Sequence, residues 1–287
     1  MYKKVLYSFS FLFYVFFLLI LFAHLLFPEK KGAYFLSGLI EEKYGIDFSV
    51  QSLEPVFPFN LRINNLEISS GRIKNLKIDE LMVSPSVPGL LSGKLKFKIN
   101  AKAFGGKIDS DIAVGLLSLT DKFFLDLSFE NINLNETKNF FGPDLMLAGK
   151  AGGRIKIDYS EKKGDFSSLI NLENFDLVSE LVIVPVSVFE ISRAEIKGEI
   201  SGDDILLKDS VIRSKAGFAS FNGQLMNIER VNRARADLAG KIVPDPEYIL
   251  RNRDNPAMSM ILPVVQNRKN MEFTVKGNLL NPMVRFK

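Results

Sequence analysis

The chain has 287 residues, of which 47% are hydrophobic, and its 37 Lys and Arg against 33 Asp and Glu give a net charge of +4. This apolar fraction is enough for a sizeable core, and the slight basic excess is smaller than nucleic-acid binding requires. The chain contains no Cys and one His, which excludes disulfides, thiol nucleophiles and Cys-based metal sites.

Residues 5–27 form an apolar run without Asp, Glu, Lys, Arg, Gly or Pro. At about 1.5 Å per residue, a helix over this run is roughly 35 Å long, which is enough to cross a bilayer. A cleavable signal peptide would have a shorter apolar stretch followed by a small-x-small site, whereas this run ends at Pro28. The sequence therefore predicts a single transmembrane helix that stays attached to the chain.

Lysines lie on both sides of this predicted anchor, so their positions do not set its orientation. Large domains cross membranes largely regardless of charge, and a short N-terminal segment is easily retained. We therefore expect residues 1–4 to be a cytoplasmic stub and the rest of the chain after the anchor to lie outside the cytoplasm.

A short amphipathic helix is expected at residues 28–45, directly after the anchor. Gly45 ends the helical pattern. The apolar side chains at helical spacing are Tyr34, Leu36, Leu39 and Ile40. We expect this helix to lie at or near the membrane surface.

From residue 46 onward, apolar and polar residues alternate with a period of two, which is typical of strands with one buried and one wet face. The clearest apolar sets are Leu95, Phe97 and Ile99; Phe123, Leu125, Leu127 and Phe129; Ile155, Ile157 and Tyr159; and Ala194, Ile196 and Ile200. Short turn-forming clusters separate them and the helices of βαβ units are lacking. We predict a mainly β fold, in which 46–287 form an elongated, twisted antiparallel sheet domain that can curve into a half-open groove.

Few short helices are expected in this domain. One is predicted around residues 135–141. The other follows Pro244, because Asp245 can cap a helix and Pro246 suits its first turn.

A loose repeat of the form Asn-apolar-polar-apolar begins at four asparagines. They are Asn65, Asn75, Asn131 and Asn174. Because Asn favours turns, we expect each of them to lie in a turn that starts a strand. The irregular spacing does not support a solenoid.

The clearest basic stripe comprises Lys94, Lys96 and Lys98, which would project from one face of a strand. These lysines are candidate contacts for lipid headgroups or for an acidic partner. The ordinary alternative is an exposed edge strand on which lysines discourage pairing with other sheets.

Residues 181–188 are almost entirely apolar, so both faces of a strand there would be apolar. Such a strand is either buried on both sides or lines an apolar groove. A groove would suit lipid acyl chains. The candidate lining residues are Phe123, Leu125, Leu127, Phe129, Val182, Val184 and Val186.

No catalytic group of residues is apparent. The single histidine, His24, lies in the predicted anchor, so it cannot join a Ser-His-Asp triad in the β domain. The glycines at 149–153 lack the order of a P-loop and are followed by a strand pattern. We predict a protein that is not an enzyme, has no cofactor or metal site and binds no nucleic acid.

Four segments together resemble the AsmA-like proteins and the type II secretion system protein N family (GspN). They are LIEEKYGIDFSVQSLEPVFPFNLRINNLEI at 39–68, LMVSPSVPGLL at 81–91, GKLKFKINAKAFGG at 93–106 and FTVKGNLLNPMVRF at 273–286. Both families follow an anchor with a short helix, a glycine and strands of this type. The GspN family is favoured because AsmA-like proteins that bridge two membranes are usually much longer.

This resemblance implies a single-pass protein of the bacterial inner membrane with its C-terminal domain in the periplasm. Its function would be that of a non-enzymatic accessory component of a type II secretion system, with other secretion proteins as partners. The alternative is an AsmA-like lipid-binding or lipid-transfer protein that shields phospholipid in an apolar β-groove.

Overall fold

The computed structural model describes most of the chain after the predicted anchor. The described residues are 18, 22, 24, 26–44, 47–69, 76–91, 94–115, 122–137, 145–179, 189–228, 234–255, 262, 270–278 and 281–286. Most of the predicted anchor at 5–27 lies outside them, and no helix within these ranges combines the length and apolarity that a membrane crossing needs. The anchor therefore stays a prediction.

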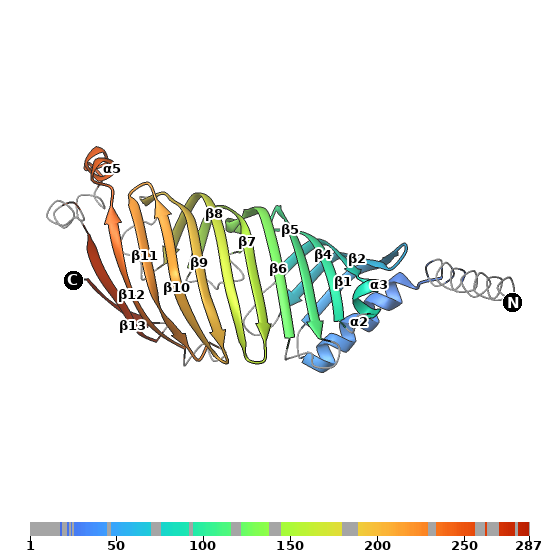
Figure 1. The fold of residues 1–287 in the computed structure, drawn as a ribbon. Helices are drawn as coiled ribbons and strands as arrows, with labels where there is room; N and C mark the ends of the chain where they lie inside the picture. Colours follow the sequence, from blue (N-terminus) through green and yellow to red (C-terminus); the bar gives the residue numbers. More distant parts are fainter. Residues whose placement is uncertain are drawn as a thin grey trace, which may run out of the picture.

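The fold is one open sheet of 14 strands in which every strand pairs with its neighbours in sequence (Figure 1). All the pairs are antiparallel. The strands are β1 (Asp47–Val56), β2 (Asn60–Ser69), β3 (Leu76–Pro85), β4 (Lys94–Ala103), β5 (Gly106–Gly115), β6 (Lys122–Asn133), β7 (Leu145–Ser160), β8 (Lys163–Ser179), β9 (Ile191–Ser201), β10 (Asp204–Ser214), β11 (Gly217–Met226), β12 (Arg235–Pro244), β13 (Met271–Asn278) and β14 (Asn281–Phe286). The predicted mainly β, antiparallel fold is confirmed.

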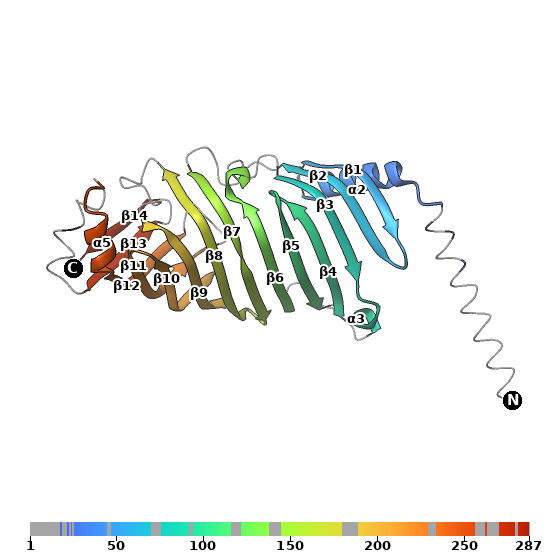
Figure 2. The ribbon, with the colours of Figure 1, turned by 90° about the horizontal axis from the view of Figure 1, so that it is seen from above.

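The sheet is long and twisted, and its edges are β1 and β14. Figure 2 shows the strand direction turning steadily from the first strands to the last, as right-handed strand twist requires. The few helices are short: α2 (Glu29–Tyr44), α3 (Val87–Leu91), the 3₁₀ turn η1 (Leu134–Thr137) and α5 (Pro246–Arg251).

Helix α2 occupies the segment for which the sequence predicts an amphipathic helix, and it packs on the first strands of the sheet. Ala33 is buried against Leu53 and Leu66, whereas Tyr34 and Phe35 are exposed. The predicted apolar stripe was therefore partly wrong. Leu36 of the predicted stripe does pack on the sheet, but the closest approach is made by the small residues Gly32 and Ala33. A Cβ at Gly32 would lie 3.2 Å from Leu53 Cδ2.

The repeated asparagines do not start strands as predicted. Asn65, Asn131 and Asn174 lie inside β2, β6 and β8 with positive φ angles of 49°, 56° and 50°. The β6–β7 register shifts beside Asn131, and the β7–β8 register shifts beside Asn174. Each shift is a β-bulge, in which one extra residue bends the strand. The bulge at Asn131 puts Ile132 on the same side as Phe129, so the apolar face continues past it. Asn75 lies outside the described residues.

Asn174→Val should lower the free energy of unfolding by about 1–2 kcal/mol, because a β-branched residue resists the left-handed conformation. Asn174→Gly should be nearly neutral, since glycine adopts positive φ freely. Urea unfolding followed by circular dichroism measures both effects. Asn171→Val, on the polar side of the same strand, is the matched control; an equal loss there would contradict the bulge explanation.

Helix α5 begins as predicted after Pro244. The Asp245 side chain accepts hydrogen bonds from the backbone N–H groups of Glu247 and Tyr248, and Pro246 occupies the first turn. The Tyr248 hydroxyl donates to the Glu190 carboxylate at 2.7 Å, and burial together with this bond raises the pKa of Tyr248 to about 12. The hydroxyl therefore remains a donor well above neutral pH. Ile249 packs with Ala216 and Met271, which attaches α5 to this part of the sheet.

Candidate functional site

The two faces of the sheet differ in chemistry. We call the side that carries Phe123, Leu125, Leu127 and Phe129 the apolar face, and the side that carries Lys94, Lys96 and Lys98 the polar face. The registers join equivalent positions of neighbouring strands, so Leu127 lies between Ser110 of β5 and Ile155 of β7. The apolar residues that alternate along each strand therefore lie side by side across the sheet and form one apolar surface.

The apolar face extends over all 14 strands. Its central row can be followed from one pair to the next, through the bulge of β10 opposite Ile196. The row comprises Pro55, Leu61, Val83, Ile99, Ser110, Leu127, Ile155, Ser168, Ile196, Ser210, Phe221, Gly240, Phe273 and Phe286. No charged residue interrupts it.

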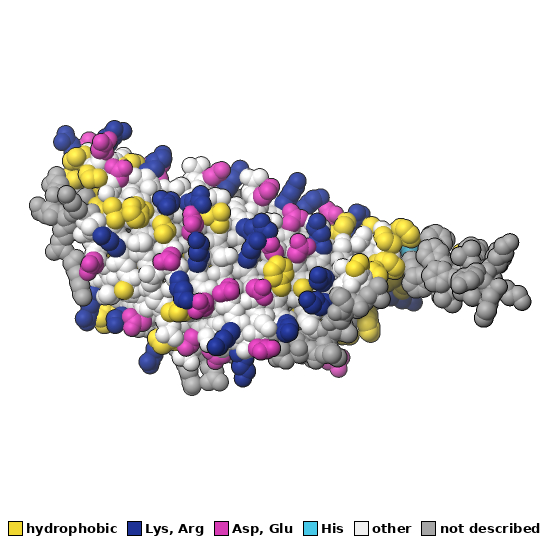
Figure 3. Space-filling view, in the orientation of Figure 1, with side chains coloured by type: hydrophobic (Ala, Val, Ile, Leu, Met, Phe, Trp, Pro, Cys, Tyr) yellow, Lys and Arg dark blue, Asp and Glu magenta, His cyan; other side chains and the backbone are white. Residues whose placement is uncertain are grey.

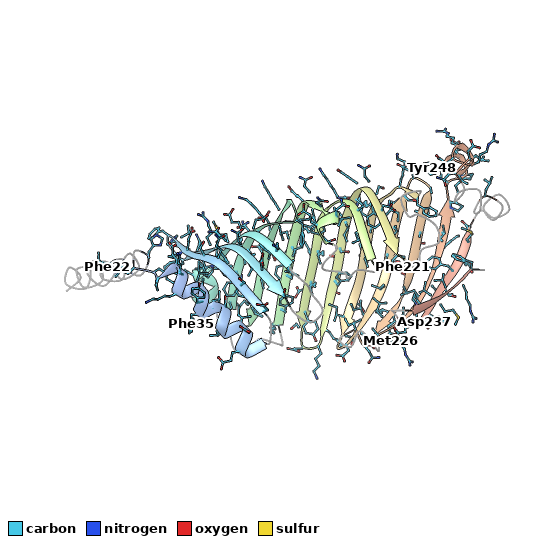
Figure 4. All side chains as sticks on the ribbon, turned by 180° about the vertical axis from the view of Figure 1, so that it is seen from behind. Phe22, Phe35, Phe221, Met226, Asp237 and Tyr248 are labelled. Atoms are coloured by element: carbon cyan, nitrogen blue, oxygen red, sulfur yellow. The ribbon has the colours of Figure 1, made fainter. Side chains whose placement is uncertain are left out.

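The described helices cover this face only at its ends and at one margin. Helix α2 packs over β1 to β3, α5 packs near β11 to β13, and η1 covers the margin of β6 and β7. Figure 4 shows α2 in front of the first strands and Phe221 on the strands farther along, away from this helix.

Side-chain size separates buried from half-buried residues in the middle of the apolar face. The small residues Ser110, Ser168 and Ser210 are buried, whereas the large Leu127 and Ile155 are only half-buried. Large neighbours shield small side chains in a single layer, but the large ones need a second layer to be covered. Among the described residues, no element supplies that layer over the middle strands.

The structure brings the predicted groove residues of β6 together on the apolar face. Phe123, Leu125, Leu127 and Phe129 are all half-buried. Their β7 partners include Tyr159, Ile157 and Ile155. The other predicted lining residues, Val182, Val184 and Val186, lie outside the described residues.

The polar face is held by cross-strand ion pairs, and Figure 3 shows acidic and basic side chains spread over it. Arg154 Nη2 lies 2.5 Å from Asp126 Oδ2, and Lys102 Nζ lies 2.6 Å from Glu80 Oε2. The hydrogen bond from Arg154 lowers the pKa of the Asp126 carboxyl, so it stays ionised at neutral pH. Each such pair adds a small stabilisation of the observed register.

Asp126→Asn should reduce the melting temperature slightly at pH 7, with the difference shrinking in acid. The lowered native pKa means that ionised Asp126 stabilises the fold above the unfolded value of about 3.9, and that this contribution disappears as pH falls through the native pKa. Thermal unfolding of both proteins from pH 7 to pH 2 measures the effect. If the difference in melting temperature between the two proteins grew in acid, the ionised Asp126 would not be stabilising the fold.

The lysine stripe lies on β4, in the interior of the sheet between β3 and β5. The edge-protection explanation for these lysines is therefore wrong, because β4 is not an edge strand: β5 pairs along it, β3 pairs with residues 97–103, and α3 lies beside Lys94 and Lys96. Lys94, Lys96 and Lys98 are exposed and line a hollow of about 620 Å³ on the polar face. They form no ion pair with the part of the chain that the structure describes.

Sequence reasoning missed two residues of this hollow, Lys122 and Phe124 of β6. Phe124 is 37% exposed and lies on the polar face, although it neighbours the apolar Phe123 in sequence. The signal was the doublet Phe123–Phe124, in which an alternating strand must expose one aromatic ring. The pairing of Phe124 with Ala113 depends on register and was not readable from the sequence.

The described residues contain no group of three or more His, Asp or Glu side chains placed to hold a metal ion. No protein-family model, curated protein or solved structure matches the chain. The resemblance to GspN and AsmA-like proteins therefore stays a prediction.

Proposed function

We propose that the protein binds lipid, with acyl chains lying on the apolar face of the sheet. The observation that carries this proposal is the row without charged residues across all 14 strands, whose large side chains are half-buried in the middle of the sheet and whose serines are buried between them. An apolar sheet face is stable only when something apolar covers it. Acyl chains meet that requirement because hydrophobic contact is non-directional.

The energetics favour such an occupant. Fully burying a Leu or Phe side chain stabilises by about 1.5–3 kcal/mol, so covering the smaller part of Leu127 that is still exposed would contribute at most about 1 kcal/mol. Each acyl methylene removed from water adds about 0.8 kcal/mol. A chain that crosses several strands therefore gains enough to outweigh its lost conformational freedom.

The shape suits lipid movement as well as storage. At about 4.8 Å between strands, the sheet extends roughly 60 Å from β1 to β14. This length offers a continuous apolar path from the α2 end to the opposite edge. With residues 5–27 as an anchor in the bacterial inner membrane, the sheet would extend into the periplasm and act in lipid transfer beside the membrane.

Two measurements test lipid binding on the full chain. Purification in a mild detergent should retain phospholipid that mass spectrometry detects. A photo-crosslinking residue at position 127 should label lipid, whereas the same residue at 128, on the polar face, should not. Absence of lipid from the purified protein, or equal labelling at both positions, would overturn the proposal.

A role as an accessory of type II secretion remains an expectation from the resemblance, and no feature of the described residues favours it over lipid binding. It predicts crosslinks to other secretion proteins and a secretion defect on gene deletion. Normal secretion in the deletion strain would exclude it without affecting the lipid proposal.

A further inference from the structure

The hollow on the polar face has a defined floor and walls, and we call it the lysine basin. Its floor is formed by the small residues Ala113 and Gly115 near the end of β5. Lysines of β4 and β6 surround this floor: Lys94, Lys96, Lys98 and Lys122. The basin of about 620 Å³ is large enough for a small phosphorylated molecule.

Register explains why the basin is hollow. Lys94 pairs with Gly115, and Lys96 pairs with Ala113, which in turn pairs with Phe124. Two long side chains on one strand thus face a glycine and an alanine on the next. The short side chains of β5 leave a hollow between the long lysine side chains of β4 on one side and the Phe124 ring of β6 on the other.

The charge around the basin is unbalanced. Four lysines and two aspartates, Asp111 and Asp158, line it. Asp111 pairs in register with Lys98, which leaves Lys94, Lys96 and Lys122 without a facing carboxylate in that register. Elsewhere on the polar face Lys102 and Lys276 do have carboxylate partners, at 2.6 Å and 3.2 Å.

Like charges held close together repel, so such a group is stabilised by a bound anion. We propose that the lysine basin binds a phosphate-bearing anion. Ammonium groups contact the phosphate oxygens as point charges, and three of them can surround one phosphate. The exposed Phe124 ring adds an apolar wall for the carbon skeleton that carries the phosphate. This site is on the opposite side of the sheet from the apolar face and does not depend on what covers that face.

The phosphate can belong to a lipid headgroup or to a soluble compound, and the probes separate these sources. Full-length protein in dodecylmaltoside micelles is titrated calorimetrically with inorganic pyrophosphate, glycerol 3-phosphate and dihexanoyl phosphatidic acid. Binding of all three indicates that phosphate alone suffices. Binding of only the phosphatidic acid assigns the site to a lipid headgroup. Both results support the proposal if they depend on the basin lysines.

The triple variant Lys94→Gln, Lys96→Gln and Lys122→Gln tests that dependence. Each lysine near an anionic group contributes about fivefold in affinity, so the triple variant should bind about a hundredfold more weakly. The melting temperature should stay equal or rise, because repulsion is relieved. The matched control removes three exposed lysines of the polar face outside the basin: Lys150→Gln, Lys163→Gln and Lys197→Gln.

A second variant, Ala113→Leu, fills the floor of the basin without changing any charge and should also abolish binding. The proposal is overturned if no probe binds the wild type at low salt, or if the control triple variant loses as much affinity as the basin triple variant. Unchanged binding by Ala113→Leu would likewise overturn it, because the anion would then be held by diffuse surface charge.

Discussion

Leu127→Glu should reduce the lipid that co-purifies with the protein by at least about tenfold, since burying an unpaired carboxylate against acyl chains costs several kcal/mol. Leu127 occupies the central row of the apolar face, between Ser110 and Ile155. A carboxylate there keeps its hydration only if the acyl chain moves away. Quantitative lipid extraction from equal amounts of wild type and variant measures the loss.

Ser128→Glu is the matched control, because it introduces the same charge one residue along β6 on the polar face. Its register partners there are Arg154 of β7 and Asp109 of β5, so the new carboxylate has one favourable and one unfavourable neighbour and stays in contact with water. Far-ultraviolet circular dichroism should show the same strand content in both variants. Equal lipid content in Leu127→Glu and wild type would mean that the apolar face is not the binding surface.

The alternation in β6 was sufficient to predict both the strand and the side of it that is apolar. Residues 123, 125, 127 and 129 lie where the period of two puts them. Pattern alone failed at Asn131 and Asn174, where the period breaks. A bulge and a turn both favour Asn with positive φ, and the choice between them depends on whether the partner strand continues past that point. That information lies in β7, far along the chain.

The polar face was predicted less completely for the same reason. The stripe of Lys94, Lys96 and Lys98 was readable from one strand, but the basin requires the registers of three. Gly115 and Lys122 become neighbours of these lysines only through pairing. The position of β4 inside the sheet, which excludes edge protection, is likewise a property of the whole topology.

The packing of α2 was hidden by the small size of its contact residues. Large apolar side chains dominate a sequence pattern, yet Tyr34 and Phe35 point away from the sheet and Ala33 is 3% exposed. The helix approaches β1 most closely at Gly32 and Ala33, where only small residues fit, and Leu36 packs beside this contact. The strand side of this contact must therefore supply most of the buried volume, and Leu66, at 2% exposure, contributes a large share of it.

Leu66→Ala should lower the free energy of unfolding by about 2–5 kcal/mol, the range for deleting a fully buried Leu side chain. Ala33 and Gly32 are too small to fill the cavity, so the full cavity cost is expected. Urea unfolding gives the free energy, and hydrogen exchange should show faster exchange in α2 than in β12, at the other end of the sheet.

The matched control is Leu206→Ala on the polar face, where the side chain is 42% exposed and its loss should cost less than about 0.5 kcal/mol. If both substitutions had the same small effect, α2 would not be held by this contact. If Leu66→Ala instead exposed the whole sheet to exchange, the α2 contact would stabilise all 14 strands as one cooperative unit. Local exchange confined to α2 and its neighbours would show that the helix can detach while the rest of the apolar face remains intact.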